Sequence, residues 1–176
     1  GYLDVITGIG PKDVHALGSQ TLAHFDGKQW DVIAHGERYK LQSVWGTSPS
    51  NIRAAGKHIN LNTGITAYQA GGSWKISDCG SQKSCNLSGI WAFGPSDVYM
   101  VGSTCFPTKT SICHFSGSSC GCGTVSGDGL EAIWASGKND IYAVGKNGVI
   151  LHNSGKGWTA QLSGTKADLR GVWGSG

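Results

Sequence analysis

The sequence predicts an all-β fold made of repeated small antiparallel sheets. Glycine accounts for 29 of the 176 residues, and charged residues make up only 14%, compared with roughly 25% in an average globular domain. This composition favours short strands joined by tight, glycine-rich turns over helices with charged faces. The second observation is a set of motifs that recurs along the chain and defines the strands one by one.

Each repeat opens with a first strand of the form Leu-x-x-Val/Ile-Trp. The motif begins at Leu41, Leu87, Leu130 and Leu169, and a weaker copy without the tryptophan begins at Leu3. A second aromatic position lies near the end of each repeat. We expect both sets of tryptophans to be structural residues that pack between repeats. They are Trp45, Trp91, Trp134 and Trp173, then Trp30, Trp74 and Trp158, with Cys120 in the corresponding place of the third repeat.

A turn and three further strands follow in each repeat. Proline or lysine, and then aspartate or asparagine two residues later, form the turn, because proline presets φ and the shorter side chain caps the backbone ahead. A second strand of the type Val-Tyr-Ala-Val-Gly comes next, and a third strand ends at histidine or tyrosine. We interpret the aspartates as turn caps and the histidines as strand-face or core residues. The positions are Asp13, Asn51, Asp97 and Asp140, then His24, Tyr68, His114 and His152.

Four antiparallel strands in about 40–45 residues, repeated in tandem, are typical of the blades of a β-propeller. The predicted blades are residues 3–40, 41–86, 87–129 and 130–168 of a single domain, 1–176, and residues 169–176 predict the first strand of a fifth blade. A blade cannot bury both of its faces alone, so neighbouring blades must pack together. The extra strand favours a ring of five or more blades completed by further sequence over a four-bladed ring or a ring of two copies.

These motifs resemble the tandem bacterial β-propeller repeats that read VWG…P-x-DVYAVG…ILHYDG…W. The fourth repeat carries the most complete match, with Lys138 in place of the proline. The hairpins from Asp26 to Trp30, Ala70 to Trp74 and Ser154 to Trp158 more distantly resemble the Asp-box, or BNR, repeats of sialidase-like propellers and of Ycf48-like assembly factors. The resemblance implies a propeller that presents binding loops.

The six cysteines predict disulfides and an oxidising compartment. Cys79 and Cys85 are expected to staple one loop, and Cys113 would face either Cys120 or Cys122 across a hairpin, which leaves Cys105 to close a longer loop to the remaining one. We therefore expect a secreted or cell-surface protein, with the periplasm as an alternative.

Charge and motif content restrict the function. The net charge of +3 is scattered, without the basic stripe that nucleic acid requires, and no apolar run is long enough to enter a membrane. The sequence holds no phosphate-binding glycine loop, metalloprotease helix or serine elbow. Only two glutamates are present, whereas a glycosidase needs a pair of carboxyl groups flanking a cleft. We expect neither catalysis nor a cofactor nor a metal.

A binding module that acts through its blade loops is the first hypothesis, with a glycan or an extracellular protein as ligand. Aromatic side chains beside amides and charges suit sugar recognition. The second hypothesis is a structural component of a larger extracellular complex or filament, and the third is a sialidase-like glycosidase or lyase. The candidate ligand residues are His35, Arg38, Tyr39, His58, Asn60 and Phe106.

Overall fold

The computed structural model describes residues 3–18, 21–34, 38–70, 73–78, 84–104 and 110–175. Its secondary structure consists almost wholly of strands, arranged as four antiparallel sheets of four strands each. In every sheet the strands are paired in the order in which they follow along the chain. The predicted all-β fold with four-stranded antiparallel blades is confirmed. No helix in the described part of the chain has the length and apolar character needed to cross a membrane.

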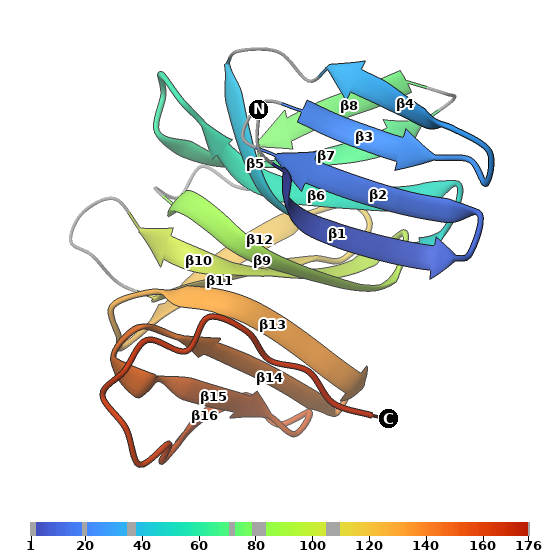
Figure 1. Cartoon of the computed structure of the whole chain (residues 1–176). Helices are drawn as coiled ribbons and strands as arrows, with labels where there is room; N and C mark the ends of the chain where they lie inside the picture. Colours follow the sequence, from blue (N-terminus) through green and yellow to red (C-terminus); the bar gives the residue numbers. More distant parts are fainter. Residues whose placement is uncertain are drawn as a thin grey trace.

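Each sheet is one blade, and the blades follow one another from the N-terminal to the C-terminal end (Figure 1). Blade 1 contains β1 (Leu3–Gly10), β2 (Asp13–Gly18), β3 (Thr21–Phe25) and β4 (Trp30–Ala34). Blade 2 contains β5 (Tyr39–Ser48), β6 (Asn51–His58), β7 (Thr63–Ala70) and β8 (Ser73–Asp78). Blade 3 contains β9 (Ser84–Gly94), β10 (Asp97–Thr104), β11 (Thr110–Phe115) and β12 (Cys120–Val125). Blade 4 contains β13 (Leu130–Gly137), β14 (Asp140–Gly145), a 3-10 turn (Lys146–Gly148), β15 (Ile150–Asn153) and β16 (Trp158–Gln161).

The core lies between the blades. Leu17 and Leu22 of blade 1 pack against Leu41 and Val44 of blade 2, and all four side chains are almost fully buried. Two further clusters join blade 2 to blade 3 and blade 3 to blade 4 in the same way. In blades 2, 3 and 4 the leucine that opens the repeat therefore belongs to the contact with the preceding blade.

A bulge interrupts the first strand of every blade directly after this leucine. In blade 2, Leu41 pairs with Gly56 and Ser43 pairs with Ala55, so that Gln42 has no partner in the ladder. The same shift leaves out Asp4 in blade 1, Ser88 in blade 3 and Glu131 in blade 4. A β-bulge bends its strand and turns the extra side chain in a new direction.

The glycine of the second strand that pairs with this leucine makes room for the bulge. A Cβ atom on Gly56 would lie 2.1 Å from the carbonyl oxygen of Lys40, and one on Gly102 would lie 1.8 Å from that of Asn86. The conserved spacing of Leu-x-x-Val/Ile and Val-Gly within the repeats is thus one structural unit, in which the glycine lets two backbones approach closely.

Residues 169–175 were expected to form a strand, but they are not paired as one. The first strand of a blade pairs with the second strand of the same blade, and residues 169–175 have no such strand beside them among the described residues. The segment instead lies along blade 4, where the backbone N–H of Leu169 donates to the carbonyl oxygen of Gly145 (2.9 Å) and Gly174 approaches the ring of Trp134.

Candidate functional site

The bulged residues of blades 2, 3 and 4 line a groove where the four blades meet. Val5, Gln42, Ser88 and Glu131 come from β1, β5, β9 and β13, and Arg170 comes from the segment after blade 4. We call this surface the central groove; its volume is about 310 Å³. Gln42, Ser88, Glu131 and Arg170 occupy the same position in their repeats, directly after the leucine.

The groove offers several unlike polar groups to a ligand. The amide oxygen of Gln42 is buried and has no hydrogen-bond partner. Glu131 supplies a carboxylate and Arg170 a guanidinium. In contrast, the hydroxyl of Ser43 is already engaged, since it accepts a hydrogen bond from the backbone N–H of Ile90 in blade 3 (3.1 Å). A buried acceptor without a partner costs free energy, and a ligand N–H or O–H at Gln42 would recover it.

Sequence reasoning missed these residues, although a signal was present. The first variable position of Leu-x-x-Val/Ile-Trp is polar in every repeat and different in every repeat: Asp4, Gln42, Ser88, Glu131 and Arg170. A position with a purely structural role tends to keep the same residue in every repeat, as the leucine and glycine positions do here. Variation at one polar position in an otherwise regular repeat indicates that these side chains form a binding surface and not a packing contact.

A second set of residues forms a row across three strands of each blade. In blades 3 and 4 the row runs Trp91, Tyr99, His114 and Trp134, Tyr142, His152, in ladder register. The tyrosine and histidine rings of each row are stacked, with centroids 4.2 Å and 4.3 Å apart.

The histidine at the end of the row hydrogen-bonds the aspartate of the first turn. His24 Nε2 lies 2.9 Å from Asp13 Oδ1, and the corresponding distances are 2.8 Å for His114 with Asp97 and for His152 with Asp140. The aspartates thus bond a side chain on the third strand. The aspartate and histidine positions of the repeat change together: in blade 2, Asn51 replaces the aspartate and Tyr68 replaces the histidine.

Hydrogen bonds to Asp97 and Asp140 favour the charged form of their carboxyl groups. Burial opposes ionisation of Asp97, but the hydrogen bonds from Lys138 and His114 outweigh it and lower the pKa of its carboxyl group. The pKa of Asp140 is lowered as well, chiefly by the hydroxyl of Ser136 and then by His152. The recurrence of the pair in three blades identifies it as a structural device of the repeat.

Blade 2 replaces the row by a cation between aromatic rings. The guanidinium of Arg53 lies 5.3 Å from the ring centroid of Tyr68 and 4.8 Å from that of Phe115 in blade 3. Arg53 also donates a hydrogen bond to the carbonyl oxygen of Pro95. Cation–π contacts of this kind add to the packing between blades 2 and 3.

Two of the predicted ligand residues face each other at the start of blade 2. Tyr39 pairs with His58 in the ladder, and their rings meet edge to face with centroids 5.1 Å apart. Arg38 and Asn60 are exposed beside them, and Arg38 accepts a backbone hydrogen bond from Ile59 (2.7 Å). We call Arg38, Tyr39, His58 and Asn60 the loop surface. His35 and Phe106 lie outside the described residues.

The predicted structural residues divide into packed and exposed ones. Trp45 stacks on Trp91 with centroids 4.1 Å apart, and its Nε1–H donates to the carbonyl oxygen of Ala92 (3.2 Å). Trp74 and Trp158 pack against the inter-blade clusters, and Trp134 meets Trp91 edge to face. Trp30 is 47% exposed and Trp173 83% exposed, so these two lie mostly in solvent.

The structure selects one of the two cysteine pairings left open across the hairpin of blade 3. Cys113 is bonded to Cys122, its ladder partner, and Cys120 is disulfide-bonded as well. Cys120 and Cys122 both pack against the cluster between blades 2 and 3. Cys79, Cys105 and the side chain of Cys85 lie outside the described residues.

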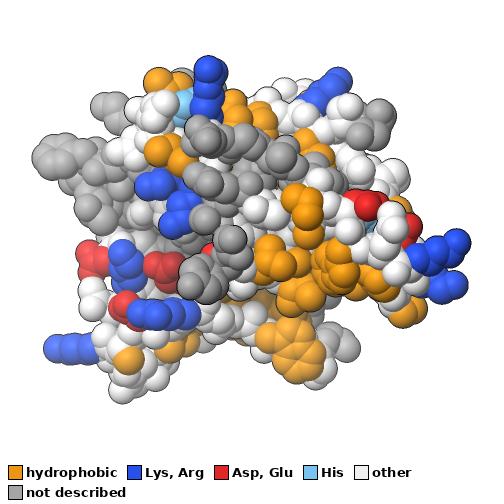
Figure 2. All heavy atoms as spheres, turned by 45° about the horizontal axis from the view of Figure 1, so that its top comes forward, with side chains coloured by type: hydrophobic (Ala, Val, Ile, Leu, Met, Phe, Trp, Pro, Cys, Tyr) orange, Lys and Arg blue, Asp and Glu red, His pale blue; other side chains and the backbone are white. Residues whose placement is uncertain are grey.

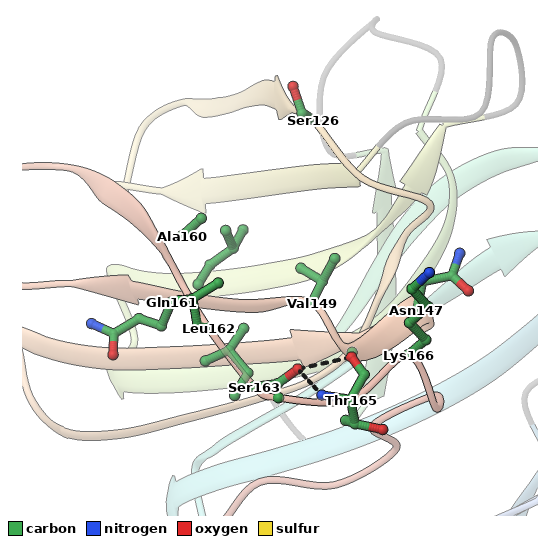
Figure 3. Close-up of a pocket in the computed structure, with 13 residues that line it drawn as sticks. Ser126, Asn147, Val149, Ala160, Gln161, Leu162, Ser163, Thr165 and Lys166 are labelled. Carbon is green, nitrogen blue, oxygen red and sulfur yellow. Dashed lines mark hydrogen bonds between the residues drawn. The ribbon is translucent and has the colours of Figure 1, made fainter.

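A second hollow lies on blade 4, where the chain leaves β16 (Figure 3). Its volume is about 470 Å³, and its wall includes Gln161, Leu162 and Lys166. The hydroxyl of Ser163 holds the turn by bonding the backbone of Thr165. None of the bulged residues lies in the wall of this pocket.

Comparison with known proteins bears on the fold. No protein-family model matches the chain, and no curated protein matches it in sequence. Among solved structures, the chain is similar to a structure described as Ycf48 bound to D1 peptide, with 14% sequence identity and a TM-score of 0.52. The match covers 92% of this chain and 67% of that one. Together with the four blades, it shows a β-propeller fold, which is consistent with a binding module.

Proposed function

We propose that the chain is a secreted, non-catalytic binding module that takes a segment of another protein into its central groove. The observation that carries the proposal is the set of bulged residues, which changes from blade to blade at one fixed position. The fold holds these side chains side by side on a rigid frame, and variable residues on a rigid frame are where repeat proteins place their binding surfaces.

The chemistry of the groove suits a polypeptide. Glu131 and Arg170 offer opposite charges, and Gln42 and Ser88 offer hydrogen-bonding groups of the kind that pair with backbone amides. The solved structure described as Ycf48 bound to D1 peptide provides an example of a similar fold that binds a peptide. The groove brings only one carboxylate among its lining residues, whereas glycoside hydrolysis uses two, which supports a role without catalysis.

Secretion is supported by the disulfide between Cys113 and Cys122. Disulfides persist in extracellular and periplasmic proteins and are rare in the reducing cytosol. The cell surface and the periplasm share this property, and a measurement of where the native protein is found in fractionated cells would distinguish them.

Selection from a library of random peptides displayed on phage tests the groove. Peptides are selected on the disulfide-intact chain and counter-selected on a variant that carries Gln42→Ala and Glu131→Gln. We expect enriched peptides that lose about tenfold or more in affinity on the variant, equivalent to at least 1.4 kcal/mol. The control His58→Ala changes the loop surface and should leave the affinity unaltered.

A glycan array on the same sample tests carbohydrate binding. Glycan binding that is lost with His58→Ala, together with no peptide enrichment, would replace the proposal by a lectin that uses the loop surface. Peptides that bind the groove variant as tightly as the original chain would show that the central groove is not the peptide-binding site.

A second candidate function, a component of a larger assembly, is favoured by the outer face of blade 1. Leu3 and Ile6 are 55% and 68% exposed, while the equivalent Leu41 and Val44 are 2% and 3% exposed. At the other end, Leu162 and Trp173 are exposed. Hydrophobic side chains also gather in the lower centre of the view in Figure 2.

Two different apolar ends suit head-to-tail contact between copies of this chain. Native mass spectrometry at micromolar concentration checks it. Oligomers that dissociate upon Ile6→Lys would support assembly, and a monomer at every concentration would exclude contact between copies.

A further inference from the structure

Blade 1 departs from the row of blades 3 and 4 at two positions, with Thr7 in place of the tryptophan and His15 in place of the tyrosine. His15 occupies the place that Tyr99 and Tyr142 hold in blades 3 and 4. The Asp13–His24 pair of the repeat is kept. Blade 1 therefore brings two imidazoles and one carboxylate together, and one ligand atom from each of the three lies within 4.8 Å of the others.

His15 is the member of this cluster that lacks a partner. Its side chain is only 3% exposed, and its Nδ1 has no hydrogen-bond partner although it lies 3.4 Å from Asp13 Oδ1. A buried imidazole nitrogen without a hydrogen-bond partner is available to a ligand that enters the cluster.

A pocket opens beside the cluster. It has a volume of about 540 Å³ and is lined by Asp13, His24 and Asp26 together with Ile9, Lys12 and Pro49. In blade 3 the corresponding carboxylate, Asp97, is 2.6 Å from the Nζ of Lys138, which projects from the first turn of the next blade. In blade 2 that turn presents Pro49 instead, so no cation from this position neutralises Asp13.

We propose that Asp13 Oδ1, His15 Nδ1 and His24 Nε2 bind one zinc ion, with water from the pocket as the fourth ligand. Two imidazoles and one carboxylate with an open fourth position form a known zinc ligand set. Ligand atoms around one tetrahedral zinc lie roughly 3.3 Å apart, given zinc–ligand distances of about 2.0–2.1 Å. The distances of 2.9 Å and 3.4 Å from Asp13 Oδ1 to the two imidazoles are close to this value.

Binding requires two local changes. The proton that His24 Nε2 shares with Asp13 must leave, so zinc competes with protons. The imidazole rings are stacked, with centroids 4.4 Å apart and an angle of 25° between planes, so the ring of His24 must turn until its lone pair meets that of His15 at the ion. The side chain of His24 is 30% exposed at the pocket and has room to turn, while the buried His15 stays in place.

Isothermal titration calorimetry with zinc chloride tests the site on the chelator-treated, disulfide-intact chain. We expect one zinc ion per chain at about pH 7.5, and weaker binding at about pH 5.5, because both imidazoles must be deprotonated. The residues that the chain itself uses in other blades provide matched variants. His15→Tyr gives blade 1 the residue of blades 3 and 4, and Asp13→Asn gives it the residue of blade 2.

Each variant should lower zinc affinity by about two orders of magnitude, since it removes a ligand. Zinc should raise the thermal midpoint of the original chain and leave that of both variants unchanged. In the reverse direction, Tyr142→His places a second imidazole beside Asp140 and His152 and should create a second zinc site.

Three results would overturn the proposal. They are no zinc binding by the original chain, equal binding by the original chain and a folded Asp13→Asn variant, and binding that is retained in His15→Tyr but lost upon His58→Ala. The last result would assign the ion to the loop surface. Near-ultraviolet circular dichroism of each variant verifies the fold, and Asp13→Asn preserves the test if His15→Tyr does not fold.

Discussion

Lys138 of blade 4 lies with its Nζ 2.6 Å from Asp97 Oδ2 of blade 3, so an ion pair joins the first turns of two successive blades. The other carboxylate oxygen of Asp97 bonds His114 within blade 3. One aspartate therefore connects the third strand of its own blade with the next blade.

Asp97→Asn should make the chain less sensitive to acid. The pKa of Asp97 is lower in the folded chain than its ordinary value, so its charge stabilises the fold at pH values above about 3.9, the value expected in an unfolded chain. That stabilisation is lost as the pH falls through the folded pKa. Thermal midpoints measured from neutral pH down to about pH 3 should therefore fall less in the variant, and parallel curves would contradict the prediction.

Gly102→Ala should destabilise the fold by about 2–3 kcal/mol, because the new Cβ has no room beside the bulge. It would lie 1.8 Å from the carbonyl oxygen of Asn86. Gly121→Ala in the same blade is the matched control, since a Cβ there meets nothing within 4 Å. Urea unfolding curves provide the comparison, and equal midpoints for the two variants would show that the bulge adapts.

Replacing Cys113 and Cys122 together by alanine should lower the free energy of unfolding by about 2.5 kcal/mol, the loop-entropy value for a short loop. The two residues are nine positions apart. Mass spectrometry of unreduced peptides tests the pairing directly. A peptide that links Cys113 to Cys120 instead would favour the other pairing across this hairpin.

Trp45→Phe should cost about 1–2 kcal/mol, because the variant loses the hydrogen bond to Ala92 and part of the stack on Trp91. Trp30→Phe is the control, because Trp30 is 47% exposed and, within the described part of the chain, its ring contacts that of Phe25 alone. Guanidinium unfolding followed by circular dichroism measures both. A larger loss for Trp30→Phe would mean that the inter-blade stack contributes little.

The sequence was sufficient to predict the strands, because each strand is bounded by turn residues that recur at a fixed spacing. It was also sufficient to predict that neighbouring blades pack together, but it was the structure that placed Leu41, Leu87 and Leu130 in these contacts. Residues 169–176 matched the first-strand motif equally well, but the motif cannot show whether a pairing partner is present.

The functional surfaces depend on register, and this is why they were harder to predict. Tyr39 and His58 were both candidate ligand residues, but only the ladder between β5 and β6 places them opposite each other. Likewise, one extra residue in a first strand decides that Gln42 lies in the central groove. The distance between Asp13 and His15 in sequence gives no indication that the His15 nitrogen lies buried without a partner.

The pairing of every described strand with its neighbour along the chain has a consequence for folding kinetics. Each hairpin closes a short loop, so the loop-closure entropy is small and the relative contact order is low for an all-β protein. Folding can then begin in any blade and spread to the next, as in other repeat proteins. Amide hydrogen exchange would accordingly divide the chain into cooperative units that coincide with blades, with the best protected unit where the inter-blade clusters lie on both sides.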